Sequence, residues 1–353
     1  MLMVIFGAGA SFDSAPTYPP GAEVLGGDGV NNFHRPPLAN ELFENRPVFA
    51  EAITRFPACQ PIVPRLRSLK GESLEAALQD LQTKAIDYPR GLQQLAAVRY
   101  YLQYILWQCG IAWRDVAKGV TNYKTLLDQI ERANKKNEPV CLVTFNYDTL
   151  LEDALSDFGL PIEAFADYTK KHPFYRVFKL HGSVNWARMV ENEIQDQNKT
   201  HAWSVAYEWI RRAAELRITD NYTLCTEYPT AIVGGRPVFP AIAIPVEKEK
   251  RFECPPNLIE ELVADYLPRV SKLLVIGWRA SETHLLGLLG NKFTGLKPGV
   301  RLHVVAGSLK DAEDAKVNIY KALPNNRPAS GSSEDGGFTN FILSGSAEKF
   351  LAT

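Results

Sequence analysis

Three apolar runs of this chain each end in a short glycine-containing or polar motif, and these motifs constrain the fold more than any other feature. The runs have the length and the β-branched or aromatic content of buried parallel strands. The runs and their motifs are Val4–Phe6 before Gly7–Ser11, Val140–Val143 before Thr144–Asp148, and Arg176–Leu180 before His181–Ser183. Because the carboxyl ends of parallel strands meet at one edge of an open sheet, we expect the three motifs to line one cleft.

The rest of the pattern predicts strands and helices in alternation. Strands are expected at 2–6, 139–145, 176–180, 272–276, 301–305 and 339–343, and helices at 148–158, 281–290, 309–322 and 345–352. Repeated strand-helix units predict a parallel sheet with right-handed crossovers. The expected fold class is therefore α/β, with a Rossmann-like doubly wound parallel sheet and an inserted helical subdomain.

Two segments interrupt this alternation. Residues 71–134 carry apolar side chains at helical spacing, Tyr123 among them, and Ser73 is placed to cap the first helix. They predict a helical insertion at about 55–135. Residues 187–230 are polar and charged, with a helical stretch near 201–216, and predict a second insertion. We therefore expect 1–353 to form a single domain that carries both insertions.

Two stretches rich in Gly, Pro, Asn or Ser predict loops, at 14–37 and at 323–337. Pro37 fits the first turn of a following helix, where its missing N–H costs nothing. Loops as long as the first one are often binding loops or lids.

Composition narrows the class of protein. The chain has 353 residues, 46% of them hydrophobic, and a net charge of −1, which gives no electrostatic reason to expect a nucleic-acid or membrane partner. No apolar stretch approaches the roughly 18 residues of a membrane span, and the first residues lack the basic segment of a signal peptide. The five cysteines form no C-x-x-C pair, which argues against a disulfide scaffold and a cysteine zinc module. These features favour a cytoplasmic protein.

The first motif begins like a dinucleotide-binding fingerprint. Gly7, Ala8 and Gly9 match the start of G-x-G-x-x-G, but Phe12 stands where the third glycine belongs. The two glycines would let the backbone approach a pyrophosphate at a helix N-terminus, and Ser11 would add a hydroxyl donor. A plain strand-to-helix turn explains the same residues, and that alternative stays open.

The other two motifs supply groups suited to proton transfer and positioning. The amide of Asn146 offers a donor and an acceptor to a ribose or a water, whereas Asp148 is also well placed to cap the next helix. His181 precedes a glycine at a strand end, and an imidazole with a pKa of about 6.5 suits proton transfer at cellular pH. A structural role for His181 is the alternative. No histidine spacing typical of a metal site is present.

In this order, the motifs resemble the sirtuin superfamily, in which a Gly-Ala-Gly-x-Ser turn, a Thr-x-Asn-x-Asp strand end and a catalytic His-Gly follow one another. A later strand that ends at Gly277 also has a counterpart there. The resemblance implies NAD binding, with His181 as the acid/base and Asn146 as its catalytic partner. The other NAD contacts that it implies are Gly7, Ala8, Gly9 and Ser11 at the pyrophosphate, Asp148 near the ribose, and Gly182, Ser183, Gly277 and Trp278.

The chain departs from the protein deacylases of this superfamily in two ways. It lacks their zinc module of two C-x-x-C pairs, and Asp13–Thr17 replaces the expected Asp-Phe-Arg segment. Ser11–Ser14 and Arg35–Asn40 instead resemble the SIR2-like proteins of bacterial anti-phage systems. In that group the domain hydrolyses NAD to ADP-ribose and nicotinamide.

The resemblance therefore implies an NAD hydrolase that uses NAD as a substrate, needs no metal and depletes NAD during anti-phage defence. Such an enzyme needs control, so we expect a homo-oligomer, a regulatory partner protein from the same defence system, or both. Two alternatives stay open. One is a protein deacylase that works without zinc, and the other is a non-catalytic module that senses NAD or ADP-ribose.

Overall fold

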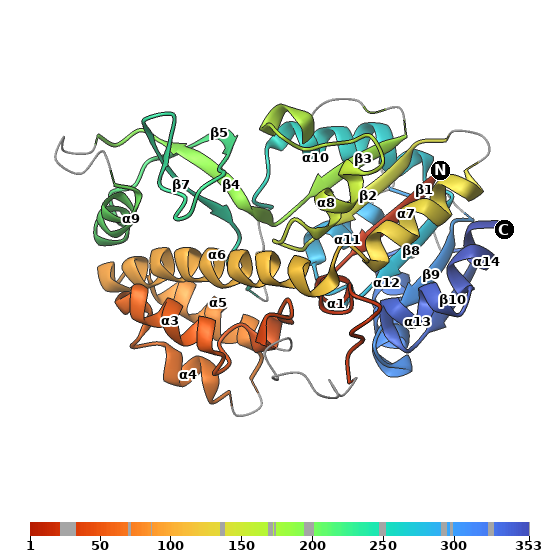
Figure 1. The fold of residues 1–353 in the computed structure, drawn as a ribbon, viewed down its shortest axis with the longest axis horizontal. Coiled ribbons are helices and arrows are strands. Elements are labelled where there is room, and N and C mark those ends of the chain that lie inside the picture. The colour runs from red at the N-terminus through yellow and green to blue at the C-terminus, as the bar shows by residue number, and fades with distance from the viewer. Residues whose placement is uncertain are drawn as a thin grey trace. The chain divides into compact units, whose positions relative to one another are not determined.

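A computed structural model gives the fold (Figure 1). It describes residues 1–21, 33–69, 72–85, 87–134, 138–168, 172, 174–193, 201–246, 252–290, 295–296, 299–323 and 328–352. The chain divides into two compact units. Unit 1 comprises Met1–Asn31, Trp113–Leu180 and Pro256–Thr353, and unit 2 comprises Asn32–Ala112 and His181–Pro255.

A six-stranded parallel sheet forms the centre of unit 1. Its strands are β1 (Leu2–Phe6), β2 (Val140–Thr144), β3 (Tyr175–Lys179), β8 (Lys272–Ile276), β9 (Arg301–Val305) and β10 (Ser330–Glu334). They lie in the order β10-β9-β8-β1-β2-β3, and every neighbouring pair is parallel. Counted along the chain, this is the 3-2-1-4-5-6 order of a doubly wound Rossmann sheet, with its switch point between β1 and β8. The expected α/β fold class is confirmed.

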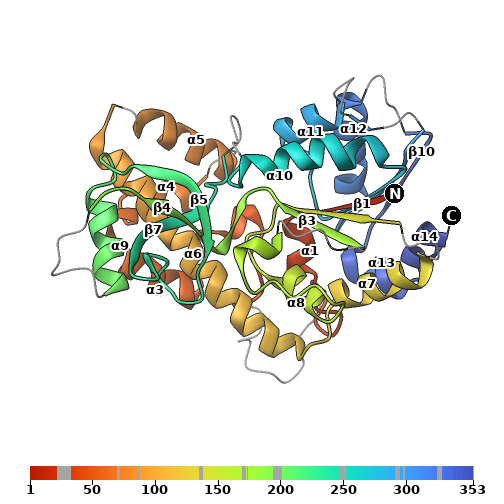
Figure 2. The same cartoon turned by 90° about the horizontal axis from the view of Figure 1, so that it is seen from above.

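Helices cover both faces of this sheet. They are α1 (Ala8–Phe12), α7 (Asn122–Ala133), α8 (Leu150–Ser156), α10 (Pro256–Glu261), α11 (Thr283–Gly290), α12 (Leu309–Ala322), α13 (Gly337–Leu343) and α14 (Ser346–Ala352), with short turns at Phe165–Tyr168 and Leu262–Arg269. Figure 2 shows α11 and α12 on one face and α7, α13 and α14 on the other. Every residue of β2 and β3 is buried, which explains the apolar side chains along β2. The two charged residues of β3, Arg176 and Lys179, form ion pairs with Glu261 and Glu152.

Five of the six expected strands are confirmed to within one residue, and the sixth is wrong. Residues 339–343 belong to α13, whereas β10 lies in the stretch expected to be a loop. The cap of α13 explains the difference: the Asp13 carboxylate accepts hydrogen bonds from Thr339 N at 2.9 Å and Thr339 Oγ1 at 2.5 Å. This cap lies 326 residues away along the chain, so no local pattern contains it.

Unit 2 combines a small antiparallel sheet with helices. Its strands, β4 (Gly182–Val190), β5 (Ile218–Leu224), β6 (Ile232–Val233) and β7 (Arg236–Ile242), lie in the order β5-β4-β7-β6. Its helices are α3 (Pro47–Arg55), α4 (Val63–Arg67), α5 (Leu74–Ala85), α9 (Ala202–Arg211) and α6 (Pro89–Ala117) as far as Ala112, with short turns at Ala39–Glu41 and Pro57–Cys59. The sequence did not predict this sheet, because the polar 187–230 stretch lacks a continuous apolar run.

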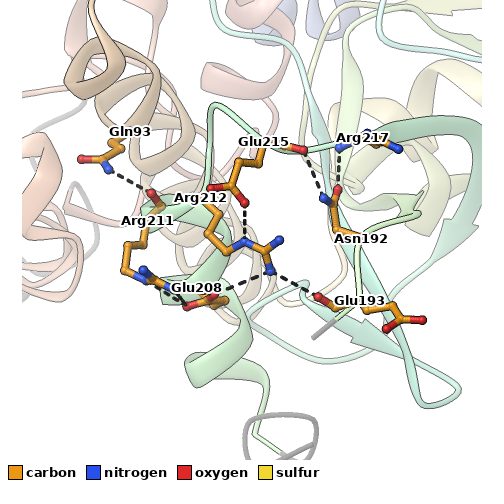
Figure 3. Close-up of polar contacts among 8 residues, drawn as sticks. All are labelled: Gln93, Asn192, Glu193, Glu208, Arg211, Arg212, Glu215 and Arg217. Atoms are coloured by element: carbon orange, nitrogen blue, oxygen red, sulfur yellow. Dashed lines mark hydrogen bonds and ion pairs between the residues drawn. The ribbon is translucent and has the colours of Figure 1, made fainter. Parts of the chain in front are cut away.

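Polar side chains tie the elements of unit 2 together. The buried amide of Gln103, on α6, donates to Val184 O at 2.7 Å and to Thr230 Oγ1 at 2.5 Å. Figure 3 shows a second group, in which Arg212 at the end of α9 donates to Glu215 Oε2 at 2.8 Å and to Glu193 O at 3.2 Å. The first group joins α6 to β4, and the second joins the end of α9 to the segments that follow β4 and precede β5.

The expected helices at 71–134 are confirmed as α5, α6 and α7, and Ser73 Oγ accepts from Ala76 N at 3.0 Å in the first turn of α5. The boundaries differ, since α7 belongs to unit 1 and α5 to unit 2. Pro37 does not open an α-helix, because only a three-residue turn follows at Ala39–Glu41. Parts of three expected segments, 22–32, 194–200 and 324–327, lie outside the described residues. The single-domain organisation stays a prediction.

Of the helices that the structure describes, none has both the length and the apolar character that crossing a membrane requires.

Candidate functional site

Two glycine turns meet at the switch point of the parallel sheet. Gly7 follows β1 and donates its amide hydrogen to Ile276 O at 3.0 Å, and Gly9 donates to Gly277 O at 3.1 Å. Gly277 follows β8 with a φ of +62°, and a Cβ there would lie 2.4 Å from Ala10 N. Only glycine allows two backbones to approach so closely.

These contacts affect the expected binding of a pyrophosphate. The amides of Gly7 and Gly9 already donate to carbonyls at the end of β8, so they are not open donors of the kind found at an anion-binding helix N-terminus. Ala8 begins α1, which is only five residues long. The visible role of the two glycines is close backbone packing, and their contact with a dinucleotide stays a prediction.

Four polar residues, which we call the Asn146 cluster, gather beside this turn. Asn146 follows β2, and its Nδ2 donates to Ser11 Oγ at 2.8 Å and to Tyr123 Oη at 3.1 Å. The hydroxyls of Ser11 and Tyr123 lie 3.0 Å apart, and Ser11 also hydrogen-bonds the carboxyl of Asp148. All four residues are buried. Ser11, Asn146 and Asp148 were expected to lie near one another, and the structure brings them together.

The direction of these bonds leaves one atom of Asn146 available. Both hydrogens of its amide nitrogen are donated within the cluster, to Ser11 and Tyr123. Among the described residues its carbonyl oxygen, Oδ1, has no hydrogen-bond partner. Asn146 therefore presents an acceptor at the carboxyl end of β2, which is the edge where open α/β sheets bind ligands.

Asp148 is the charged member of the cluster. Its Oδ1 accepts from Leu150 N at 3.1 Å, so it also fills the capping role expected at the start of α8. Burial raises the pKa of the Asp148 carboxyl, while nearby Lys179 and the hydrogen bonds from Ser11 and Leu150 lower it.

A buried ion pair supports Asp148 from β3. Lys179 Nζ lies 2.8 Å from Glu152 Oε1 and also donates to the backbone carbonyl of Asp148. The hydroxyl of Tyr168 donates to the same Glu152 oxygen at 2.7 Å. The side chains of Lys179 and Glu152 are only 1% and 6% exposed, so this pair is desolvated.

Two aromatic side chains stack across the end of β1. Phe145 follows β2 and Trp278 follows β8, and their ring centroids lie 5.3 Å apart at an interplanar angle of 18°. The indole nitrogen of Trp278 donates to Glu282 Oε2. Trp278 is therefore held by a ring contact and a hydrogen bond of its own fold.

His181 lies two residues after the end of β3, belongs to unit 2, and is described with that unit. It is 5% exposed, and its carbonyl accepts from Ala243 N at 2.9 Å. Gly182 has a φ of +77°, and a Cβ there would lie 2.0 Å from Ala241 O, so glycine is required after the histidine. Ser183 is fully buried in β4.

The sequence missed three residues of this region. Tyr123 lies on the apolar face of α7 and was grouped with the core, although its hydroxyl belongs to the Asn146 cluster. Lys179 and Glu152 were not singled out. The available signal was Lys179, which lies inside a run with the pattern of a buried strand. A buried charge requires a partner.

The described residues contain no group of three or more His, Cys, Asp or Glu side chains placed to hold a metal. All five cysteines are free and buried.

Comparisons with known proteins give a partial family match. Residues 140–235 match the model of the SIR2-like domain, and this segment contains Asn146, Asp148 and His181. A SIR2-like domain implies an NAD-related activity. A comparison with curated proteins gives no match. A solved structure described as "The Structural basis of Sirtuin Substrate Affinity" is 14% identical, with a TM-score of 0.35, and the alignment covers 98% of this chain and 93% of that chain.

Proposed function

We propose that this protein hydrolyses NAD at the bond between nicotinamide and ribose, giving nicotinamide, ADP-ribose and a proton. The observation that carries the proposal is the buried Asn146 cluster at the end of β2, beside the switch point. Two of its members, Asn146 and Asp148, lie inside the segment that matches a SIR2-like domain. A SIR2-like domain favours NAD as the substrate, and the polar cluster favours chemistry over binding alone.

Asn146 acts in this proposal as a hydrogen-bond acceptor. Its Oδ1 accepts from a hydroxyl of the nicotinamide ribose or from the attacking water, and it holds that group without titrating. Cleavage of the glycosidic bond passes through an oxocarbenium-like state, in which the bonding electrons leave with nicotinamide. In its ionised form, the buried Asp148 carboxylate stabilises positive charge that develops nearby.

His181 acts as the general base. It accepts the proton that the water loses as its oxygen bonds to the anomeric carbon of the ribose. A base of this kind contributes about 10²- to 10⁴-fold in rate. Positioning and electrostatic stabilisation supply most of the remaining acceleration.

The test is to incubate the purified protein with NAD and to measure nicotinamide release. We expect Asn146→Ala and His181→Ala each to lower kcat by at least about 100-fold. Matched controls are Asn318→Ala and His201→Ala. His201 is exposed and Asn318 is half-buried, and the Asn318 amide makes only a 3.4 Å contact to a backbone carbonyl.

Two results contradict the proposal. One is intact NAD under every activating condition tried, and the other is full activity in both the Asn146 and the His181 variant. The same assay separates the alternatives. A deacylase consumes NAD only when an acyl-lysine peptide is added, and a sensor binds NAD or ADP-ribose saturably without turnover.

We further propose that this activity is a regulated effector of anti-phage defence. The resemblance of Ser11–Ser14 and Arg35–Asn40 to SIR2-like defence proteins supports this role. An enzyme that depletes NAD is toxic when always active, so control by a homo-oligomer or by a regulatory partner protein belongs to the proposal. Co-purification from the native host, followed by the NAD assay with and without the partner, tests it.

A further inference from the structure

We propose that Tyr123 is a positioning residue, which fixes the side-chain amide of Asn146 with Oδ1 available and both N–H groups turned into the fold. The catalytic consequence rests on the proposed NAD hydrolysis, whereas the orientation itself does not. Tyr123 contributes through its hydroxyl, which contacts Asn146 Nδ2 at 3.1 Å and Ser11 Oγ at 3.0 Å.

The ring of Tyr123 is held on both edges, so its hydroxyl has a defined position. Tyr123 is 1% exposed, and its ring packs against Phe6 with centroids 5.2 Å apart and against Phe338 with centroids 5.5 Å apart. Both contacts are edge-to-face, the arrangement that aromatic pairs prefer. A buried tyrosine packed in this way presents its hydroxyl at one place.

Asn122, the residue before Tyr123, anchors the start of α7 to Asp13 and Ser14, which follow the glycine turn after β1 and helix α1. Asn122 Nδ2 donates to Asp13 O at 2.7 Å and to Thr339 Oγ1 at 2.8 Å, and Asn122 N donates to Ser14 O at 2.7 Å. These bonds set the position of α7 against the end of α1, the helix that carries Ser11. Tyr123 therefore reaches the cluster from a fixed helix.

A count of hydrogens sets the orientation of the amide. Three contacts join the amide and the two hydroxyls: Asn146 with Ser11, Asn146 with Tyr123, and Ser11 with Tyr123. Each contact needs one hydrogen. With Nδ2 inward, the amide supplies two hydrogens and either hydroxyl supplies the third, so all three contacts are satisfied.

The opposite orientation fails the same count. With Oδ1 inward, the amide supplies no hydrogen to these contacts, and the two hydroxyls supply only two hydrogens for three contacts. The inward Nδ2 is therefore the orientation that the cluster enforces, in which Ser11 and Tyr123 both accept from Asn146.

Removing the hydroxyl of Tyr123 eliminates two of these contacts, the one with Asn146 and the one with Ser11. In Tyr123→Phe, one N–H of Asn146 loses its acceptor, and Ser11 loses a hydrogen-bond partner while the aromatic ring remains in place. A buried N–H without a partner is costly, so the amide turns to find another one. Oδ1 then leaves the position in which the proposed mechanism uses it.

The first test is kinetic and compares Tyr123→Phe with Tyr101→Phe. Tyr101 is a matched control, because it is a fully buried tyrosine whose hydroxyl donates one bond, to Leu42 O at 2.7 Å. We expect Tyr123→Phe to lower kcat by about 10- to 100-fold with KM within about twofold, because misplacement of a catalytic group acts on the rate. We expect Tyr101→Phe to keep both constants.

The second test needs no turnover. Protein labelled with ¹⁵N at asparagine gives a side-chain signal for Asn146, assigned by its loss in Asn146→Asp. We expect two slowly exchanging hydrogens in the wild type and faster exchange of at least one of them in Tyr123→Phe, with no change in Tyr101→Phe.

An unchanged Asn146 signal in Tyr123→Phe overturns the proposal, and so does a wild-type kcat of Tyr123→Phe in an active enzyme. If the wild type shows this signal but never cleaves NAD, the proposed function fails while the positioning of Asn146 by Tyr123 stands.

Discussion

The amide of Gly9 donates to the carbonyl of Gly277 at 3.1 Å, and this bond joins the turn after β1 to the turn after β8. In a doubly wound sheet these two turns flank the position where ligands usually enter. Here their backbones contact each other directly, because neither carries a side chain at the point of closest approach. The glycines of the first motif are therefore explained by packing at the switch point, whether or not NAD contacts them.

We expect Gly277→Ala to lower the free energy of unfolding by about 2–5 kcal/mol. Its φ of +62° costs an L-residue about 1–2 kcal/mol, and a Cβ placed 2.4 Å from Ala10 N adds an overpacking penalty of about 1–3 kcal/mol. Gly345→Ala is the control, since its φ is +75° but no atom lies within 4 Å of its Cβ position. Urea unfolding of both variants checks this, and an equal loss in the two would show that the backbone contact contributes nothing.

We expect Lys179→Met to destabilise the fold by about 3–5 kcal/mol, because it leaves the Glu152 carboxylate buried without its cation. Lys84→Met removes an exposed pair with Asp80, where the loss is at most about 1 kcal/mol. The double variant Lys179→Met with Glu152→Gln should recover part of the loss. Urea unfolding measures all three. A Lys179→Met loss no larger than that of Lys84→Met contradicts the prediction.

The loss of unfolding free energy caused by Lys179→Met should also grow as the pH rises. Burial raises the pKa of Asp148 and Lys179 lowers it, so removing the lysine moves the folded-state pKa further above the unfolded value. Between about pH 4 and that raised pKa, the folded state then binds more protons than the unfolded state, and stability falls as pH rises. Unfolding at pH 5 and pH 7.5 checks this, and a penalty that shrinks with pH would count against it.

His303 gives a pH dependence of the opposite sign. Burial lowers the pKa of its imidazole, and Glu334 opposes the shift less strongly. Because the folded-state pKa lies below the unfolded value of about 6.5, this contribution to stability is present above pH 6.5 and is lost as pH falls toward the folded-state pKa. We expect His303→Gln to show a smaller drop in Tm between pH 7.5 and 5.5 than the wild type. His201→Gln, at an exposed position, should keep the wild-type drop.

The parallel sheet was predictable because its central strands are buried on both faces, so most of their residues are apolar. β10 is the exception. It is an edge strand, Ser330–Glu334, with no β-branched or aromatic residue, and its pairing with β9 comes from the tertiary structure. The start of α13 depends in the same way on Asp13, a cap that no local window includes.

The candidate site was predictable where a residue follows a strand and carries a polar group. Ser11, Asn146 and Asp148 satisfy both conditions, and they meet in one cluster. Tyr123 satisfies neither, because an aromatic residue on the apolar face of a helix usually belongs to the core. Its hydroxyl becomes part of the cluster only through the packing of α7 against the sheet.

The stacked pair Phe145 and Trp278 should contribute energy beyond the area that it buries. Aromatic pairs at this separation contribute about 0.5–1.5 kcal/mol, and a double-mutant cycle isolates that part. We expect Phe145→Leu and Trp278→Leu to show a coupling of this size in urea unfolding. Phe178→Leu is the control, because the Phe178 ring contacts Tyr266 instead, so its loss should add to that of Trp278→Leu. If the losses of unfolding free energy in Phe145→Leu and Trp278→Leu are additive, the stacked rings contribute no coupling between the turn after β2 and the turn after β8.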